Sequence, residues 1–362
     1  MSIKKDKYFL NLAINLAKNC LGYTGPNPAV GAVVVKDNQV VSFGNTHFSG
    51  RPHAEINALK KIDKKLLKNS TIYISLEPCS HYGKTPPCVN KIISSKIKRV
   101  VYALNDKDIR TSGKSHKILI SNKIKVKKNI CTADAKSVYK EYFYSKKTNK
   151  PYVYGKLAIS NDYFLKDKKN FYITNDHSLK TTHILRSKVN CILTTSKTIN
   201  DDNPRLSCRI KGLENLSPKI AILDKKLDIK KNTFVINNAK NKKTYLFHNS
   251  TNKKKIKLLK QMKVELIYTP LYKDKLNFNF VLDQLYVKEI SSLLIEGGKS
   301  IMESFIKEDR FNEFFLFISS QKLNNNGFLK IKNVKKMLSN KFKNIKLKDT
   351  FLDNDNLIHY YK

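Results

Sequence analysis

The chain has 362 residues, which is more than one ordinary domain and predicts two. A formal net charge of +41 at pH 7 would favour a nucleic-acid or membrane partner, but the excess is almost all lysine and is spread over the whole chain without an arginine-aromatic patch. We therefore expect no nucleic-acid partner, and a diffuse positive field that attracts anionic substrates such as phosphate esters.

Cysteine usage and hydropathy predict a reduced, cytoplasmic enzyme with no membrane partner. Six cysteines are too few for a disulfide scaffold in a chain of this size. The first residues lead into an amphipathic segment, and no apolar run with a small-residue cleavage site follows them. No window reaches the ~18 apolar residues of a membrane span.

The N-terminal part of the sequence predicts alternating helices and strands. Apolar residues at helical spacing indicate a helix over 6–20, after which the glycines and prolines of 22–28 (GYTGPNP) impose a turn of fixed shape. The segments that follow are a strand pair over 29–44, a helix over 53–62, a strand over 71–76, a helix from 86–88 to about 95 and a strand over 99–104. This order indicates a mixed sheet between helices.

Two motifs in this part carry metal-binding side chains: His53-Ala54-Glu55, and Leu76 to Cys88, which reads LEPCSHYGKTPPC. Taken singly, a histidine or a cysteine is more often a structural residue. Together His53, Cys79 and Cys88 form the donor set of a catalytic zinc ion, with a fourth position open for water.

Glu55 stands two residues from His53, so it can face the same cavity without binding the metal. A zinc ion lowers the pKa of its water, and Glu55 is placed to take the proton and deliver it to a ring nitrogen and a departing amine. The sequence therefore predicts hydrolytic deamination of an amidine-like ring carbon.

The segments TGPNPAVGAVVV, HAE and LEPCSHYGKTPPC resemble the deaminase half of the bifunctional riboflavin-biosynthesis deaminase/reductase family. The spacer SHYGKTPP between the two cysteines separates this family from deaminases that keep a short Pro-Cys-x-x-Cys. The resemblance implies that Asn27 holds the pyrimidine and that His81 and Lys84 line the substrate pocket. Over 106–114 the match is partial, and Asp108 stands where an asparagine is common.

A polar segment over 146–151 has the composition of a linker, which predicts domains over 1–148 and 149–362. The second half shows short apolar strands alternating with helical patterns, typical of βαβ units around a largely parallel sheet. The predicted strands are 151–160, 191–199, 219–224, 244–247, 264–268 and 292–298, and the predicted helices are 179–186, 281–288 and 301–307.

Glu296-Gly297-Gly298 lies between a buried strand and a helix. Its glycines let backbone amides approach an anion at the helix N-terminus, although such a pair is an ordinary turn about as often.

The resemblance extends to the reductase half. It implies an α/β chain: a cytidine-deaminase-like three-layer domain followed by a dihydrofolate-reductase-like domain that binds NADPH. The residues that it assigns to the cofactor are Ala158, Tyr172, Thr198, Asp202, Lys225, Gly298, Lys299 and Ser300. Those that it assigns to the substrate are Lys156, Asn170, Arg186, Leu206, Arg209 and Glu296, with the two arginines suited to bidentate phosphate binding.

Three departures from the family pattern fall in this half. The family's Ser-Leu-Asp-Gly is Ser160-Asn161-Asp162-Tyr163, so the glycine is lost, and the segment 162–172 is about two residues short of the family pattern. A tyrosine replaces tryptophan at 172, and Asn170 stands where serine or glycine is common.

We expect zinc-dependent deamination of 2,5-diamino-6-(5-phosphoribosylamino)pyrimidin-4(3H)-one and then NADPH-dependent reduction of its ribosyl group to ribityl. Lys156 and Asp202 both remain candidates for the reductase proton donor. The family also implies a homo-oligomer formed through the reductase domain. The alternatives are a nucleotide or RNA deaminase with a nucleic-acid-binding second domain, and a non-catalytic protein on a deaminase fold.

Overall fold

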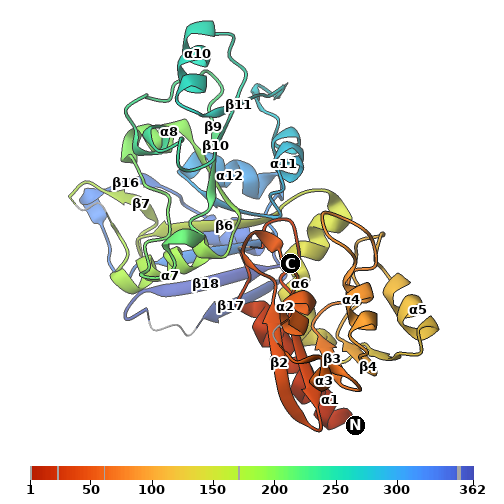
Figure 1. Ribbon diagram of the computed structural model, residues 1–362. Helices are drawn as coiled ribbons and strands as arrows, with labels where there is room; N and C mark the ends of the chain where they lie inside the picture. Colours follow the sequence, from red (N-terminus) through yellow and green to blue (C-terminus); the bar gives the residue numbers. More distant parts are fainter. Residues whose placement is uncertain (1, 23, 61, 170–171, 349–351) are drawn as a thin grey trace. The chain divides into compact units, whose positions relative to one another are not determined.

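The computed structural model describes residues 2–22, 24–60, 62–169, 172–348 and 352–362. The chain divides into two compact units, Met1–Lys150 and Pro151–Lys362. Each unit has its own sheet (Figure 1) and its own core. None of the helices among these residues is both long and apolar enough to cross a membrane.

The first unit is built on a five-stranded sheet with the order β2-β1-β3-β4-β5. β1 is antiparallel to β2 and β3, whereas β3, β4 and β5 are parallel to one another. Its elements are α1 (Ile3–Lys18), β1 (Gly31–Lys36), β2 (Gln39–Asn45), a 3-10 turn (Phe48–Gly50), α2 (Ala54–Lys60), α3 (Lys64–Leu67), β3 (Thr71–Ile74), α4 (Cys88–Ser94), β4 (Arg99–Tyr102), α5 (Lys114–Ser121), β5 (Lys125–Lys128) and α6 (Thr132–Thr148).

Two glycines let helices lie directly on this sheet. A Cβ at Gly31 would come within 2.0 Å of the Ala13 carbonyl oxygen of α1, and a Cβ at Gly44 would come within 2.5 Å of the Ala58 nitrogen of α2. Gly44 lies opposite Ala32, the neighbour of Gly31, so the two glycines point to opposite faces of the sheet. Helices therefore cover both faces, which confirms the predicted three layers.

A buried carboxylate ties α1 to the sheet. Asp6 is fully buried and accepts hydrogen bonds from Tyr73 Oη (2.9 Å), from both terminal nitrogens of Arg99 (2.8 and 2.7 Å) and from Lys127 Nζ (3.1 Å). Burial alone would raise the pKa of Asp6, but these donors outweigh it and lower the pKa to about 2. One side chain thus joins α1 to β3, β4 and β5.

The second unit is built on a nine-stranded sheet with the order β11-β10-β9-β8-β14-β6-β15-β18-β17. The strands from β11 to β15 are parallel, and β18 and β17 add an antiparallel edge. Its strands are β6 (Tyr152–Ile159), β7 (Phe164–Asp167), β8 (Cys191–Thr195), β9 (Lys219–Leu223), β10 (Thr244–His248), β11 (Glu265–Tyr268), β12 (Leu271–Tyr272), β13 (Lys275–Leu276), β14 (Ser292–Glu296), β15 (Glu313–Ile318), β16 (Gly327–Lys330), β17 (Asn344–Lys348) and β18 (Asn356–Tyr361).

Helices and 3-10 turns connect these strands: α7 (Asp176–Ser187), α8 (Ser196–Asp202), Glu214–Leu216, α9 (Phe234–Asn237), α10 (Lys253–Gln261), α11 (Phe278–Val287), α12 (Lys299–Lys307), Asn324–Asn326 and α13 (Val334–Ser339). Successive residues of one strand enter different cores: Leu193 packs with α11 and α12, while Ile192 packs with α10. The parallel sheet is therefore covered on both faces, as the short apolar strands predict.

The prediction of a strand that enters a loop over 191–199 is right for the strand, but a helix, α8, takes the place of the loop. β8 stops at Thr195, whose side chain accepts a hydrogen bond from the Thr198 nitrogen and so caps α8. Threonine is common both in strands and at helix N-caps, so the sequence alone does not show that Thr195 begins a helix.

Candidate active sites

The three expected zinc ligands meet in the first unit. His53 directly precedes α2, Cys79 follows β3 through a short loop, and Cys88 opens α4. His53 Nδ1 lies 3.3 Å from Cys88 Sγ and 3.6 Å from Cys79 Sγ, and the three donor atoms lie within 4.8 Å of one another. Tetrahedral zinc with bonds of roughly 2.1 and 2.3 Å separates neighbouring ligand atoms by roughly 3.6 Å. The donor set and its spacing both fit zinc.

The two thiols also show why this cluster suits a cation. The hydrogen bond from Cys88 lowers the pKa of the Cys79 thiol to about 4, and the same contact raises the pKa of Cys88 well above its usual value. The second thiol cannot ionise beside the first thiolate unless a positive charge lies between them. A bound zinc ion supplies that charge.

Glu55 lies in the first turn of α2 and is buried, with 3% of its surface exposed. Burial, followed by the nearby Cys79 charge, raises the pKa of Glu55 to about 7. It is not part of the three-residue donor group found among the described residues. A buried carboxyl group beside the ligands is suited to proton transfer rather than to ligation.

Asn27 is held against the turn that leads to His53. Its Nδ2 donates to the Gly50 carbonyl (3.3 Å), and a Cβ at Gly50 would lie 2.2 Å from the same nitrogen. Gly50 also has φ 90°, which only glycine adopts readily. These contacts hold Asn27 in place, and its amide is half-buried.

His81 and Lys84 lie on the spacer between the two cysteines. His81 is half-buried and its Nδ1 pairs with Thr111 Oγ1 at 3.0 Å, whereas Lys84 is exposed. Burial, and next the charge of Arg110, lower the pKa of His81, which therefore presents a neutral ring at pH 7.

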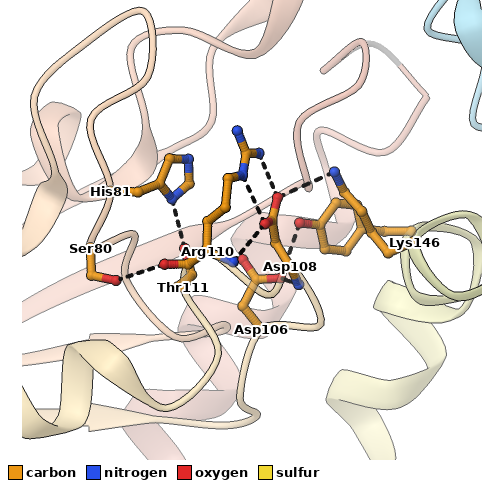
Figure 2. Close-up of polar contacts among 8 residues, drawn as sticks. Ser80, His81, Asp106, Asp108, Arg110, Thr111 and Lys146 are labelled. Atoms are coloured by element: carbon orange, nitrogen blue, oxygen red, sulfur yellow. Dashed lines mark hydrogen bonds and ion pairs between the residues drawn. The ribbon is translucent and has the colours of Figure 1, made fainter.

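A polar network that the sequence did not predict joins the spacer to 106–111 (Figure 2). Asp108 accepts from Arg110 Nε (2.9 Å) and Nη2 (2.6 Å) and from Lys146 Nζ (3.3 Å). Tyr142 Oη donates to Asp106 (3.0 Å), whose pKa burial raises to about 6. The only signal in the sequence is the departure from the family pattern at Asp108.

The second unit brings three of the expected substrate residues together. Arg186 on α7 donates to Glu296 with Nε (2.7 Å) and Nη2 (2.8 Å), and Glu296 at the end of β14 pairs in register with Lys156 on β6. Burial lowers the pKa of Lys156, and the charge of Glu296 opposes this. The Arg186 fork that was expected to bind phosphate is therefore engaged by Glu296.

The remaining substrate candidates are placed differently. Leu206 is buried at φ 48° and Arg209 is exposed on the same loop, which Arg186 Nη1 anchors through the Ser207 carbonyl (3.2 Å). His183, which the sequence did not single out, also pairs with that carbonyl through Nδ1 (3.0 Å). Asn170 lies outside the described residues.

The Gly-Gly turn leads into the N-terminus of α12, where the family resemblance places the cofactor phosphate. A Cβ at Gly297 would lie 3.7 Å from Thr198 Oγ1 and 3.8 Å from Thr194 Oγ1, so the turn and α8 approach closely. Thr194 Oγ1 is buried and has no hydrogen-bond partner among the described residues. Gly298 caps α12 with open space beside it, and Lys299 and Ser300 form the first turn. An unpaired hydroxyl next to a helix N-terminus fits a phosphate-bearing cofactor.

Other cofactor candidates have partners within the chain. Asp202 forms an ion pair with Lys166, and Lys225 forms one with Asp274. Tyr172 lines a cavity of about 260 Å³ with segments 173–175, 319–321 and 353–355. Ala158 lies on β6, two residues after Lys156.

Tyr163 occupies the position of the missing family glycine. Its φ is 71°, in the left-handed region that glycine favours, and its ring packs against the core beneath Lys335. The chain keeps the turn that the glycine would make, at the cost of backbone strain.

Comparisons with known proteins match both units of the chain. Residues 3–104 match the cytidine and deoxycytidylate deaminase zinc-binding region, and residues 151–324 match the RibD C-terminal domain. Riboflavin biosynthesis protein RibD of Aquifex aeolicus is 36% identical over 316 residues, which is 87% of this chain and 86% of that protein. The Bacillus amyloliquefaciens protein is 34% identical over 319 residues, 87% and 84% of the two chains.

Solved structures match along almost the whole chain. Acinetobacter baumannii RibD aligns with a TM-score of 0.85 and 26% identity over 99% of both chains. The Thermotoga maritima deaminase/reductase aligns with a TM-score of 0.83 and 27% identity, also over 99% of both. These matches confirm the predicted fold class, a deaminase-like domain followed by a reductase domain. The chain belongs to the RibD family, the bifunctional zinc-dependent deaminases and NADPH-dependent reductases of riboflavin biosynthesis.

Proposed function

We propose that His53, Cys79 and Cys88 hold the zinc ion of the deaminase half and that Glu55 moves its protons. The observation that carries this proposal is the convergence of the three donor atoms within 4.8 Å beside one buried carboxyl group. Bound zinc supplies Lewis-acid activation of water. Glu55 takes up the proton that the water loses and returns it to the ring nitrogen and to the departing amine.

We propose that the substrate is the diaminopyrimidine ribotide for which the Thermotoga maritima deaminase/reductase is named, and that Asn27, His81 and Lys84 bind it. The Asn27 amide, fixed by Gly50, offers the donor and acceptor that a pyrimidine edge requires. The neutral His81 ring adds a hydrogen-bonding group, and Lys84 adds charge for the phosphate.

For the reductase half, we propose that Gly298, Lys299 and Ser300 bind NADPH phosphate, with Thr198 and Ala158 beside them. NADPH supplies a hydride, which reduces the ribosyl group to ribityl. Tyr172, Asp202 and Lys225 complete the cofactor set that the family resemblance implies.

We propose that Lys156, Asn170, Arg186, Leu206, Arg209 and Glu296 bind the reductase substrate. Glu296 binds Arg186 of α7 and pairs in register with Lys156, and Arg209 is the arginine left exposed for phosphate. Of the two proton-donor candidates we favour Lys156, because its lowered pKa eases proton release while Asp202 is paired with Lys166.

We place the domain boundary at 148, where α6 ends, with the deaminase over 1–148 and the reductase over 149–362. Small ribotides are the proposed ligands, without nucleic acid, and a homo-oligomer through the reductase domain rests on the family resemblance alone. All six cysteines are free, which supports a reduced, cytoplasmic location.

The test follows ammonia release and NADPH oxidation by the purified full chain given zinc, the ribotide and NADPH. We expect Glu55→Gln to abolish ammonia release and to retain bound zinc, measured by elemental analysis. Glu289→Gln, an exposed carboxylate in the second unit, is the control. Loss of zinc from Glu55→Gln would show that Glu55 is a ligand, and absence of both signals from the zinc-loaded wild type would refute the proposed reactions.

A further inference from the structure

Two arginines flank His81 at the rim of the deaminase site. A Cβ placed on Gly83 would lie 3.7 Å from Arg51 Nη2 and 3.9 Å from His81 Nε2, so Arg51 and His81 border the same point on the spacer. On the other side, His81 is tied through Nδ1 to Thr111, the neighbour of Arg110. The charge of Arg110 acts on the His81 ring, and Figure 2 draws both side chains in one network with Thr111 and Ser80.

The Arg110 side chain is held in place but remains open on one edge. Arg110 donates to the Asp108 carboxylate with Nε and Nη2. The same carboxylate also accepts a hydrogen bond from the backbone nitrogen of Arg110 (3.0 Å) and forms an ion pair with Lys146. The Arg110 side chain is 58% exposed, whereas that of Asp108 is 9% exposed. The hydrogen bonds of the described residues leave the Nη1 edge unused, and that edge can make a second fork.

Charges around this point favour an anion. The carboxylate of Asp108 pairs with the two cations Arg110 and Lys146, and Arg51 adds a further positive charge across Gly83. Asp106, whose pKa is about 6, adds a second carboxylate, so these groups together carry about one net positive charge at pH 7, which favours an anion such as a phosphate monoester. A ribotide carries such a phosphate one sugar away from the ring that is deaminated.

The position relative to the zinc ligands is also suitable. Arg51 stands two residues before His53 and is close enough for its charge to act on the His53 ring. The charges of Cys79 and His53 act in the same way on His81. The arginines therefore border the ligand cluster without belonging to it. Lys146 already provides a positive charge that neutralises Asp108, so neutralisation of Asp108 does not by itself require Arg110.

We propose that Arg110, with Arg51, binds the phosphate of the deaminase substrate, and that Asp108 and Lys146 are positioning residues for Arg110. This inference rests on the proposed deamination and names the group that makes it selective for a ribotide. Arginine suits this role because its fork matches two phosphate oxygens at once.

The test compares ammonia release from the ribotide and from its dephosphorylated nucleoside, using the zinc-loaded full chain. We expect Arg110→Leu to raise KM for the ribotide about tenfold with kcat unchanged, and to leave kcat/KM for the nucleoside unchanged. Arg110→Lys should recover part of the loss, and Arg51→Leu should add a similar loss. Asp108→Asn should raise KM for the ribotide only about threefold, because Arg110 stays but is less ordered.

Lys117→Leu, which removes one charge from an exposed position on α5, is the control for general electrostatic attraction. Equal losses on the two substrates would mean that Arg110 is structural and would overturn the proposal. An unchanged KM for the ribotide in both Arg110 variants would overturn it as well. No ammonia from the wild type with either substrate would instead refute the proposed function, so the two failures are distinguishable.

Discussion

Asp6 offers a quantitative test of how the first unit is held together. Its carboxylate is fully buried and receives donors from three strands, which lower its pKa from 3.8 to about 2. A shift of this size corresponds to about 2.5 kcal/mol of folding free energy. We expect Asp6→Asn to lower the free energy of unfolding of this unit by about that amount at pH 7.

The pH dependence follows from the sign of the shift. The folded-state pKa of Asp6 lies below the unfolded value, so its contribution is complete above about pH 4 and is lost as the pH falls toward 2. The difference between wild type and Asp6→Asn should therefore fall to about half its size at pH 3.

The chain has no tryptophan, so urea unfolding is followed by far-UV circular dichroism, with amide exchange in α1 and β3 to identify the unit. Asp37→Asn, an exposed turn residue, is the matched control and should change stability by less than about 0.5 kcal/mol. A difference below about 0.5 kcal/mol for Asp6→Asn, or one that is the same at pH 6 and pH 3, would refute the reasoning.

Two further variants test the packing and the reductase site. Gly31→Ala should destabilise the chain by about 3 kcal/mol in the same unfolding assay, because the new Cβ would lie 2.0 Å from a backbone oxygen of α1. Gly298→Ala is the control and should leave stability unchanged, because the space beside Gly298 is open. Arg186→Lys loses the fork to Glu296, so KM for NADPH-dependent reduction should rise about tenfold while ammonia release stays normal. Arg310→Lys is the control, and an equal fall in ammonia release would point to misfolding.

The zinc cluster could be predicted because its ligands lie in two short motifs that are close in the sequence. His53, Cys79 and Cys88 stand at junctions between a strand or loop and a helix, and few other roles combine these residue types at such positions. Glu55 followed from its spacing to His53. The three-layer fold of the first unit followed in the same way, from short apolar strands between amphipathic helices.

The network around Arg110 could not be predicted, because its partners come from distant segments. Asp108 is fixed by Lys146, which lies on a different element, α6, and His81 reaches Thr111 from the spacer. A lysine-rich sequence gives no means of telling Lys146 from its exposed neighbours. The ion pair between Arg186 and Glu296 could not be predicted for the same reason, since Arg186 lies on α7 and Glu296 at the end of β14, 110 residues later.

Several strands were missed for a related reason. β5 reads KVKK and β17 reads NIKLK, where lysines mask the alternation that marks a strand. Both lie at sheet edges, where a strand pairs with one neighbour only and can carry exposed lysines. Residues after 307 received no predicted elements, although β15 is a fully buried strand in the middle of the sheet.

The in-register pairing of Lys156 with Glu296 has a consequence for synthesis of the chain on the ribosome. The deaminase ligands lie between His53 and Cys88, so that site can assemble once α4 has emerged. The reductase cluster needs β6 and β14 side by side, and it must wait until Glu296 has left the exit tunnel. A nascent chain of this enzyme can therefore complete its zinc cluster well before it completes the site proposed for the reductase substrate.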